Sequence, residues 1–201
     1  WVTFAESMTP LMTPAAEYIA EIAVTNGKHP KRVLDIAAGH GLFGISVARR
    51  APKAEIVAQD WPNVLEVAQR NAGEAGVGDR YRPLPGDAFT VDFGTGYDLV
   101  LLTNFLHHFD EPTCESLLKK LYPSLNPGGR IITLEFVPNA DRITPPVPAS
   151  FSMMMLALTP SGDAYTMEQL DRMFTSTGFK KNELLQVPRS AEQLIVSTKD
   201  S

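Results

Sequence analysis

The stretch that decides the fold is Val33-Leu34-Asp35-Ile36-Ala37-Ala38-Gly39-His40-Gly41 (VLDIAAGHG). Its first half is a short apolar run typical of a buried strand, and its second half is a glycine-rich turn that leads into a helical pattern. Gly39, Gly41 and Gly44 have the spacing G-x-G-x-x-G, and Asp60 follows about 20 residues later. In such a unit the backbone amides of the loop face a nucleotide and the later carboxylate binds ribose hydroxyls. The sequence therefore predicts a nucleotide-binding strand, loop and helix.

Strand and helix patterns alternate along most of the remaining chain, which predicts an α/β fold with a mostly parallel sheet. The last two strands are separated by only a few residues, and so short a connection permits an antiparallel hairpin but no parallel crossover. We therefore expect a Rossmann-like, mostly parallel seven-stranded sheet that ends in an antiparallel hairpin. The predicted strands are 32–37, 54–60, 81–85, 97–104, 130–137, 180–188 and 192–199, and the predicted helices are 14–24, 41–50, 63–76, 111–122, 151–158 and 166–178. Residues 126–129 are expected to form a turn, and residues 138–148, with four prolines, a loop.

The composition excludes several classes of protein. A chain of 201 residues fits one domain, and a net charge of −5 argues against nucleic-acid binding. There is no apolar run of about 18 residues, so no membrane segment is expected. The single cysteine, Cys114, is expected to be packed in the core of a protein from a reducing, cytoplasmic compartment. No cluster of His, Cys, Asp or Glu has the spacing of metal ligands, so no metal is expected.

Three features favour S-adenosylmethionine (SAM) over a dinucleotide such as NAD. Asp35 lies inside the first strand, where a buried acid needs donors or a cation, and SAM brings an ammonium group. After the third strand, Gly86-Asp87-Ala88-Phe89 offers a carboxylate for the adenine amine and a ring for its face. The closing hairpin and the short chain leave no room for the separate catalytic domain that dehydrogenases usually add. A NAD-dependent oxidoreductase is therefore the least favoured reading.

In these motifs and their order the chain resembles the class I SAM-dependent methyltransferases, and more narrowly the catalytic domain of the small-molecule O-methyltransferases of the caffeate and acetylserotonin type. The resemblance extends to AQDWP (58–62), LHHFDEPTC (106–114) and NPGGRIITLE (126–135), and to the terminal YTMEQL (165–170) with its following GF. It implies SAM as cofactor, S-adenosylhomocysteine as product and a small-molecule acceptor as partner.

The family also has an N-terminal dimerisation domain that this sequence lacks, and the chain begins at Trp1 without a methionine. We therefore expect a trimmed piece of a longer protein, with a helical segment at 1–28 packed on a catalytic domain at 29–201. The chain is expected to be a monomer or weak dimer, with residues 1–12 loosely attached. A firm dimer is expected only where the missing domain is present.

The expected cofactor contacts have alternative, purely structural explanations. The glycines could serve only a tight turn, Asp60 could cap a helix, Asp87 could make an Asx-turn, and the two aromatic rings could be core. Asn104, at the end of the fourth strand, could contact SAM or make a buried backbone bond. The complete set of predicted cofactor residues is Asp35, Gly39, Gly41, Asp60, Trp61, Asp87, Ala88, Phe89 and Asn104.

His107 is the predicted general base. A phenol ionises only near pH 10, so a neutral histidine that takes the proton during attack on the methyl group is useful at neutral pH. The resemblance aligns His107 with the family's base and Glu135 with a glutamate that orients it. Three positions depart from the family: His108 replaces an acid, Phe109 replaces a tryptophan, and Ala164 stands where a second glutamate is usual. His107 could therefore also be structural.

The predicted reaction is transfer of the SAM methyl group to a hydroxyl oxygen of a small organic molecule. The alternatives are a C- or N-methyltransferase on the same scaffold, and a SAM-binding module without catalytic activity. Met153, Met154 and Met155 occupy adjacent helical positions that cannot all face one way, and could be core or line the acceptor pocket.

Overall fold

The computed structural model describes the backbone of residues 2–201 and the side chains of residues 11–25 and 27–201. Its strands form a seven-stranded sheet in the order β3-β2-β1-β4-β5-β7-β6. The sheet is mostly parallel and its C-terminal strands are antiparallel, which confirms the predicted α/β fold. The chain divides into two compact units, residues 1–101 and 102–201.

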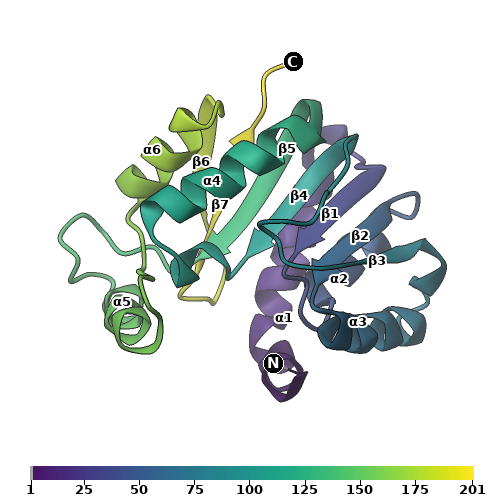
Figure 1. Cartoon of the computed structure of the whole chain (residues 1–201), viewed down its shortest axis with the longest axis horizontal. Coiled ribbons are helices and arrows are strands. Elements are labelled where there is room, and N and C mark those ends of the chain that lie inside the picture. Colours follow the sequence, from purple (N-terminus) through teal and green to yellow (C-terminus); the bar gives the residue numbers. More distant parts are fainter. Residues whose placement is uncertain (1) are drawn as a thin grey trace. The chain divides into compact units, whose positions relative to one another are not determined.

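The first unit contains a parallel β-α-β arrangement that is shown in purple to blue in Figure 1. Strand β2 pairs in parallel with β1 on one side and with β3 on the other, and α2 and α3 pack on these strands. Its elements are α1 (Val2–Val24), β1 (Arg32–Ile36), α2 (Leu42–Arg50), β2 (Glu55–Asp60), α3 (Pro62–Glu74), β3 (Tyr81–Pro85) and most of β4 (Tyr97–Thr103), with short 3-10 turns at Thr25–Gly27 and Gly78–Arg80. All four strands agree with the sequence prediction to within one residue at each end.

Helix α1 is longer than predicted. We expected it to begin at Pro14, but the helix runs through this proline from Val2. Met12, two residues before this proline, is buried together with Ala15 and Ala16, and α1 packs along α2. Packing of this face therefore outweighs the cost of a proline in the helix. The predicted loose attachment of residues 1–12 concerns mainly side chains that lie outside the described ones.

The second unit ends in the predicted antiparallel hairpin. Strand β7 pairs antiparallel with both β5 and β6, and α4 packs beside α6 (Figure 1). The elements are α4 (Glu111–Leu121), β5 (Leu125–Glu135), α5 (Pro146–Leu158), α6 (Met167–Ser176), β6 (Lys181–Gln186) and β7 (Gln193–Thr198), with 3-10 turns at Leu106–His108 and Tyr122–Ser124. Thr166 caps α6 in a full capping box with Gln169, and the helix begins within one residue of the predicted start at 166.

Two predicted boundaries in this unit are wrong by more than two residues. Strand β5 begins at Leu125, so it includes the predicted turn at 126–129. The amide of Gly128 donates to the Asp200 carbonyl, and the amide of Lys199 donates to the Gly129 carbonyl, so pairing with the C-terminal segment keeps this stretch extended. The predicted loop at 138–148 ends early, because α5 begins at Pro146, a position at which a helix tolerates proline.

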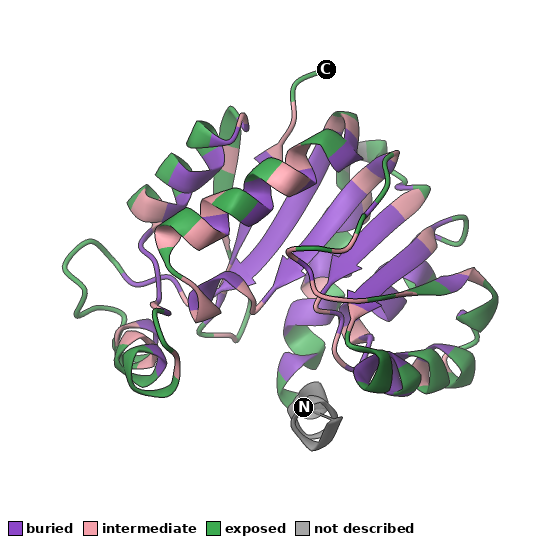
Figure 2. Ribbon diagram, in the orientation of Figure 1, coloured by how far each residue is buried: buried purple, intermediate pink, exposed green. Residues whose placement is uncertain are grey.

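Burial follows the expected pattern for a covered sheet. The strands β1, β2, β5 and β7 are almost wholly buried, whereas α3, α4 and α6 alternate buried and exposed positions (Figure 2). Helix α5 is different, because most of its large apolar side chains are exposed: Val147, Met153, Met154, Leu156 and Leu158. Of the three adjacent methionines only Met155 is core. Within the described residues, no helix is long and apolar enough to cross a membrane.

The two helical glycines Gly44 and Gly73 give a matched test of the packing of α2. A Cβ at Gly44 would lie 2.7 Å from Asp35 Oδ2 and 2.8 Å from Ile56 Cγ2, both on buried strands. A Cβ at Gly73 would meet nothing within 4 Å. We predict that Gly44→Ala lowers the free energy of unfolding by about 1–3 kcal/mol through overpacking. Gly73→Ala should raise it by about 0.5–1 kcal/mol, since alanine favours the helix. Urea denaturation measures both, and an unchanged stability in Gly44→Ala would refute the close approach.

Candidate active site

The glycine loop of the first unit closes on the carboxylate of Asp60. Gly39 and Gly41 have φ values of 57° and 81°, which favour glycine. The Gly39 amide donates to Asp60 Oδ2 over 2.9 Å, and the Trp61 amide donates to Oδ1 over 2.7 Å. Burial raises the pKa of Asp60, although these two amides oppose the shift. The structure thus brings the loop and the predicted ribose acid together.

Asp35 lies beneath this loop and is completely buried. Its Oδ2 accepts a hydrogen bond from the Gly44 amide over 3.0 Å, whereas its Oδ1 has no partner among the described residues. Burial raises the pKa of Asp35 to about 7; the Gly44 amide opposes the shift and the charge of Asp60 adds to it. Asp35 therefore anchors the start of α2 through Gly44, a contact that the sequence analysis did not foresee.

Two further side chains shape the loop and were missed by the sequence analysis. Gln59 Nε2 donates to the Gly86 carbonyl over 2.6 Å, and the Ala37 amide donates to Gln59 Oε1 over 3.3 Å. Gln59 therefore joins the segments that follow β1 and β3. His40 is buried within the loop itself, and its Nδ1 accepts a hydrogen bond from the Leu42 amide over 3.2 Å. The sequence signal that could have identified Gln59 is a polar glutamine at the end of a predicted buried strand.

The other predicted adenine contacts differ in exposure. Trp61 is 50% exposed, so a large aromatic surface lies beside Asp60 rather than in the core. Asp87 makes the Asx-turn that was its structural alternative, since the Phe89 amide donates to its Oδ1 over 2.9 Å. Ala88 is buried and Phe89 is partly exposed.

The second unit pairs His107 with Glu135. The Nδ1 atom of His107 lies 2.6 Å from Glu135 Oε2, and both side chains are buried. The other oxygen, Oε1, accepts hydrogen bonds from the amides of Phe105 and Leu106 over 3.1 and 2.9 Å. A carboxylate only accepts hydrogen bonds, so Nδ1 is the donor to Glu135 and the lone pair of a neutral His107 resides on Nε2.

The electrostatic environment of His107 favours its charged form. Burial opposes the imidazolium, but the charge and hydrogen bond of Glu135, together with the charge of Glu192, outweigh it and raise the pKa of His107. The neighbouring His108 differs, since burial and the charge of His107 lower its pKa. A histidine with a free Nε2 and a buried carboxylate behind it can accept a proton and stabilise the resulting cation.

Asn104 and Glu192 extend this cluster. Asn104 adopts a left-handed φ of 52°, and its amide donates to the Leu134 carbonyl over 2.9 Å. Glu192 is buried in the turn between β6 and β7, directly before Gln193, which pairs with Glu135 in the β5–β7 register. Asn104 therefore makes a backbone hydrogen bond, and Glu192 lies next to the strand position that faces Glu135. Glu192 was missed, because no local pattern marks an acid that precedes an apolar strand.

Gly162 and Cys114 fix the segment around His107. A Cβ at Gly162 would lie 2.2 Å from the His107 carbonyl oxygen, so only glycine permits this close approach. Cys114 is buried, and its Sγ donates to the Leu106 carbonyl over 3.3 Å. Burial raises the pKa of its thiol to about 12, which keeps it protonated and confirms the prediction of a packed cysteine.

Phe151 of α5 lies against His107, and Phe136, the residue directly after β5, lies against Phe151. Phe151 meets the imidazole edge-on at a centroid distance of 4.8 Å, and Phe136 stacks on Phe151 at 4.2 Å. Both phenylalanines are only partly buried. This pair of rings is an apolar surface suited to a flat organic molecule.

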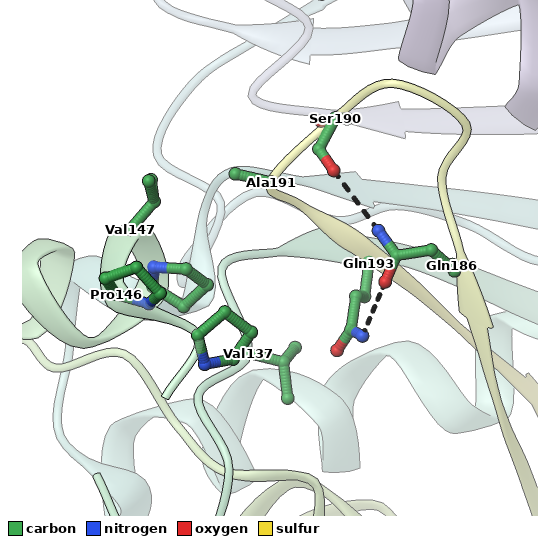
Figure 3. Close-up of a pocket in the computed structure, with 9 residues that line it drawn as sticks. Val137, Pro146, Val147, Gln186, Ser190, Ala191 and Gln193 are labelled. Atoms are coloured by element: carbon green, nitrogen blue, oxygen red, sulfur yellow. Dashed lines mark hydrogen bonds between the residues drawn. The ribbon is translucent and has the colours of Figure 1, made fainter. Parts of the chain in front are cut away.

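A cavity of about 200 Å³ lies between the start of α5 and the β6–β7 turn (Figure 3). Gln193 Nε2 donates to Gln186 Oε1 over 2.9 Å in its wall, and Gln186 in turn donates to the Ser190 carbonyl over 3.2 Å. Glu192 lies between two of the lining residues in sequence. The cavity is smaller than the ~300–1,000 Å³ usual for ligand pockets. Its lining residues are Val137, Pro145, Pro146, Val147, Pro148, Gln186, Ser190, Ala191 and Gln193. Across the described part of the chain, no three His, Cys, Asp or Glu residues gather so as to hold a metal ion.

A glycine loop closed by an acid from the next strand, on a mostly parallel seven-stranded sheet with antiparallel C-terminal strands, is the Rossmann-like methyltransferase fold. More narrowly, the chain belongs to the O-methyltransferase domain family, whose model matches residues 16–180. This confirms the family resemblance inferred from the sequence.

Three relatives illustrate the family membership. The chain is 51% identical to a Nostoc punctiforme protein assigned as an O-methyltransferase, with a TM-score of 0.96 over 99% of this chain and 60% of that one. It is 29% identical to the L-tyrosine C(3)-methyltransferase of Streptomyces lavendulae over 82% of this chain and 45% of the relative. It is 27% identical to the demethylspheroidene O-methyltransferase of Rhodobacter capsulatus over 96% of this chain and 47% of the relative. The chain thus spans about half the length of these curated relatives.

Proposed function

We propose that the protein transfers the methyl group of SAM to a hydroxyl oxygen of a small aromatic acceptor, with Nε2 of His107 as the general base. The observation that supports this most directly is the 2.6 Å contact of His107 Nδ1 with Glu135 Oε2. It leaves Nε2 as the basic atom, and Nε2 has no hydrogen-bond partner among the described residues.

The cofactor is proposed to bind at the glycine loop of the first unit. Asp60 accepts two backbone amides and still has lone pairs for the ribose hydroxyls. The exposed face of Trp61 and the ring of Phe89 are suited to the adenine, with Asp87 and Ala88 beside it. Asp35 would act from behind the loop, by holding Gly44, rather than by meeting the ammonium group directly.

The chemistry is a displacement in which the acceptor oxygen forms a bond to the methyl carbon as the carbon–sulfur bond breaks. The acceptor proton passes to His107 Nε2, and Glu135 stabilises the imidazolium that forms. S-adenosylhomocysteine leaves as the neutral thioether. Alignment of the reactants is expected to contribute about 7–11 kcal/mol and the base about 10²–10⁴-fold in rate.

The aromatic surface of Phe136 and Phe151 beside the imidazole supports an aromatic acceptor. Removing a phenol proton also activates the carbon next to the hydroxyl, because the negative charge of a phenolate is shared with that carbon. C-methylation of a phenol is therefore the second candidate, favoured by the similarity to an L-tyrosine C(3)-methyltransferase. The two products are distinguished by their exchangeable protons, since O-methylation removes the phenolic proton and C-methylation keeps it.

Binding of SAM tests the proposed ribose contact. We predict that Asp60→Ala weakens SAM binding by about 1.5–3 kcal/mol, the range for a hydrogen bond to a charged group. The matched control is Asp79→Ala, because Asp79 is an exposed aspartate of the same unit. Titration calorimetry with SAM and with NAD measures both variants. Tight binding of NAD in place of SAM, or equal effects of the two substitutions, would contradict the assignment.

Kinetics of a His107 variant test the base. His107→Ala should lower kcat at least about 10²-fold on a weakly acidic phenol and leave SAM affinity unchanged. The exposed His29→Ala is the control. Because the base must be neutral and the pKa of His107 is raised, kcat/KM of the unmodified protein should rise with pH to a plateau, with the midpoint of the rise above about pH 6.5, the ordinary histidine pKa. Retention of most activity by His107→Ala would make His107 structural.

A further inference from the structure

Glu192 is a second buried carboxylate near His107. It lies in the turn between β6 and β7 with only 2% of its surface exposed. Ser190 Oγ donates to its Oε2 over 3.3 Å, and its own amide donates back to Ser190 Oγ over 3.1 Å. Its Oε1 is buried and has no hydrogen-bond partner among the described residues. A turn that needed only a cap would place this acid at the surface, where water solvates it without cost.

Glu192 is tied to the segment that presents the base. It directly precedes Gln193, which pairs with Glu135 in the β5–β7 register. The side chain of Asn104 stabilises the ionised form of Glu192, and Asn104 directly precedes the Phe105–His107 segment held by Glu135. Asn104 is itself fixed in a left-handed conformation with its amide on the Leu134 carbonyl. Two buried acids, Glu135 on β5 and Glu192 before β7, therefore lie at the strand ends from which this segment is held.

The charges around Glu192 indicate that this residue does more than stabilise the β6–β7 turn. Burial raises the pKa of Glu192 to about 7; the charge of Glu135 adds to the shift, while Asn104, Ser190 and the charge of His107 oppose it. The free-energy cost of burying the Glu192 charge falls when His107 becomes protonated, because the two charges attract each other. The other ionisable groups that interact with this cluster are His108 and the thiol of Cys114.

We propose that Glu192 is a positioning residue for His107, which fixes the segment of the base through Asn104 and adds a second negative charge that stabilises the protonated imidazole. Ala164, where a second glutamate was expected from the resemblance, has no carboxylate, and Glu192 supplies one from the β6–β7 turn. This inference rests on the proposed role of His107 as the base. It adds a residue that no local sequence motif identifies.

The test is the pKa of His107 measured by NMR titration of its imidazole in the 201-residue chain, without cofactor or acceptor. Removal of a nearby negative charge lowers the pKa of a histidine. Glu192→Gln should therefore lower the pKa of His107 by about half a unit or more. Glu183→Gln removes a charge from the same hairpin at an exposed position, and should leave the pKa of His107 unchanged.

Glu192→Asp is the second variant, because it keeps the charge but withdraws it by one methylene. It should lower the pKa of His107 by less than Glu192→Gln does. A folded Glu192→Gln variant that leaves the pKa of His107 unchanged overturns the proposal, and so does a Glu192→Asp variant that lowers this pKa as much as Glu192→Gln does. In the methyl-transfer assay, the acidic limb of kcat/KM should move to lower pH in Glu192→Gln, with the KM for SAM unchanged. If no methyl transfer is found, the proposed function fails, whereas the NMR result still decides the role of Glu192.

Discussion

Glu135 lies buried at the end of β5, and its carboxylate accepts hydrogen bonds from two backbone amides and one imidazole. An ionised carboxylate away from water is strongly unfavourable unless its lone pairs are satisfied, and these three donors satisfy it. The same contacts fix the Phe105–His107 segment and decide which imidazole nitrogen is basic. Burying the charge of Glu135 is unfavourable, but the same charge stabilises the protonated form of His107. The structure and the proposed chemistry therefore depend on this one interaction.

The first unit also uses carboxylates to hold backbone amides. Asp60 binds the Gly39 and Trp61 amides, and Asp35 binds the Gly44 amide beneath the loop. Glycine is required at Gly44, because a Cβ there would lie 2.7 Å from Asp35 Oδ2. Each loop that presents a chemical group is thus held by a carboxylate from a neighbouring strand end. Rigid placement of this kind is what a displacement reaction needs, because its rate depends on alignment.

The parts of the molecule that depend on local sequence could be predicted. Apolar runs and glycine turns located β1 to β4 within a residue, and the helical pattern at 166–178 located the start of α6 within a residue. The His107–Glu135 pair followed from the family resemblance and is present in the structure. Contacts made only by tertiary folding could not be predicted. Glu192 and Gly162 have no distinctive local pattern, yet each is positioned by residues far away in the chain.

The tautomer of His107 tests the central claim most directly. Nitrogen-15 NMR of the imidazole, recorded above its pKa in the chain without ligands, distinguishes a protonated Nδ1 from a protonated Nε2. The account predicts that Nδ1 carries the proton and donates it to Glu135, and that Nε2 has the free lone pair that accepts a proton from the methyl acceptor. A neutral His107 with its proton on Nε2 would contradict the account, because the side chain could then not act as the proposed base.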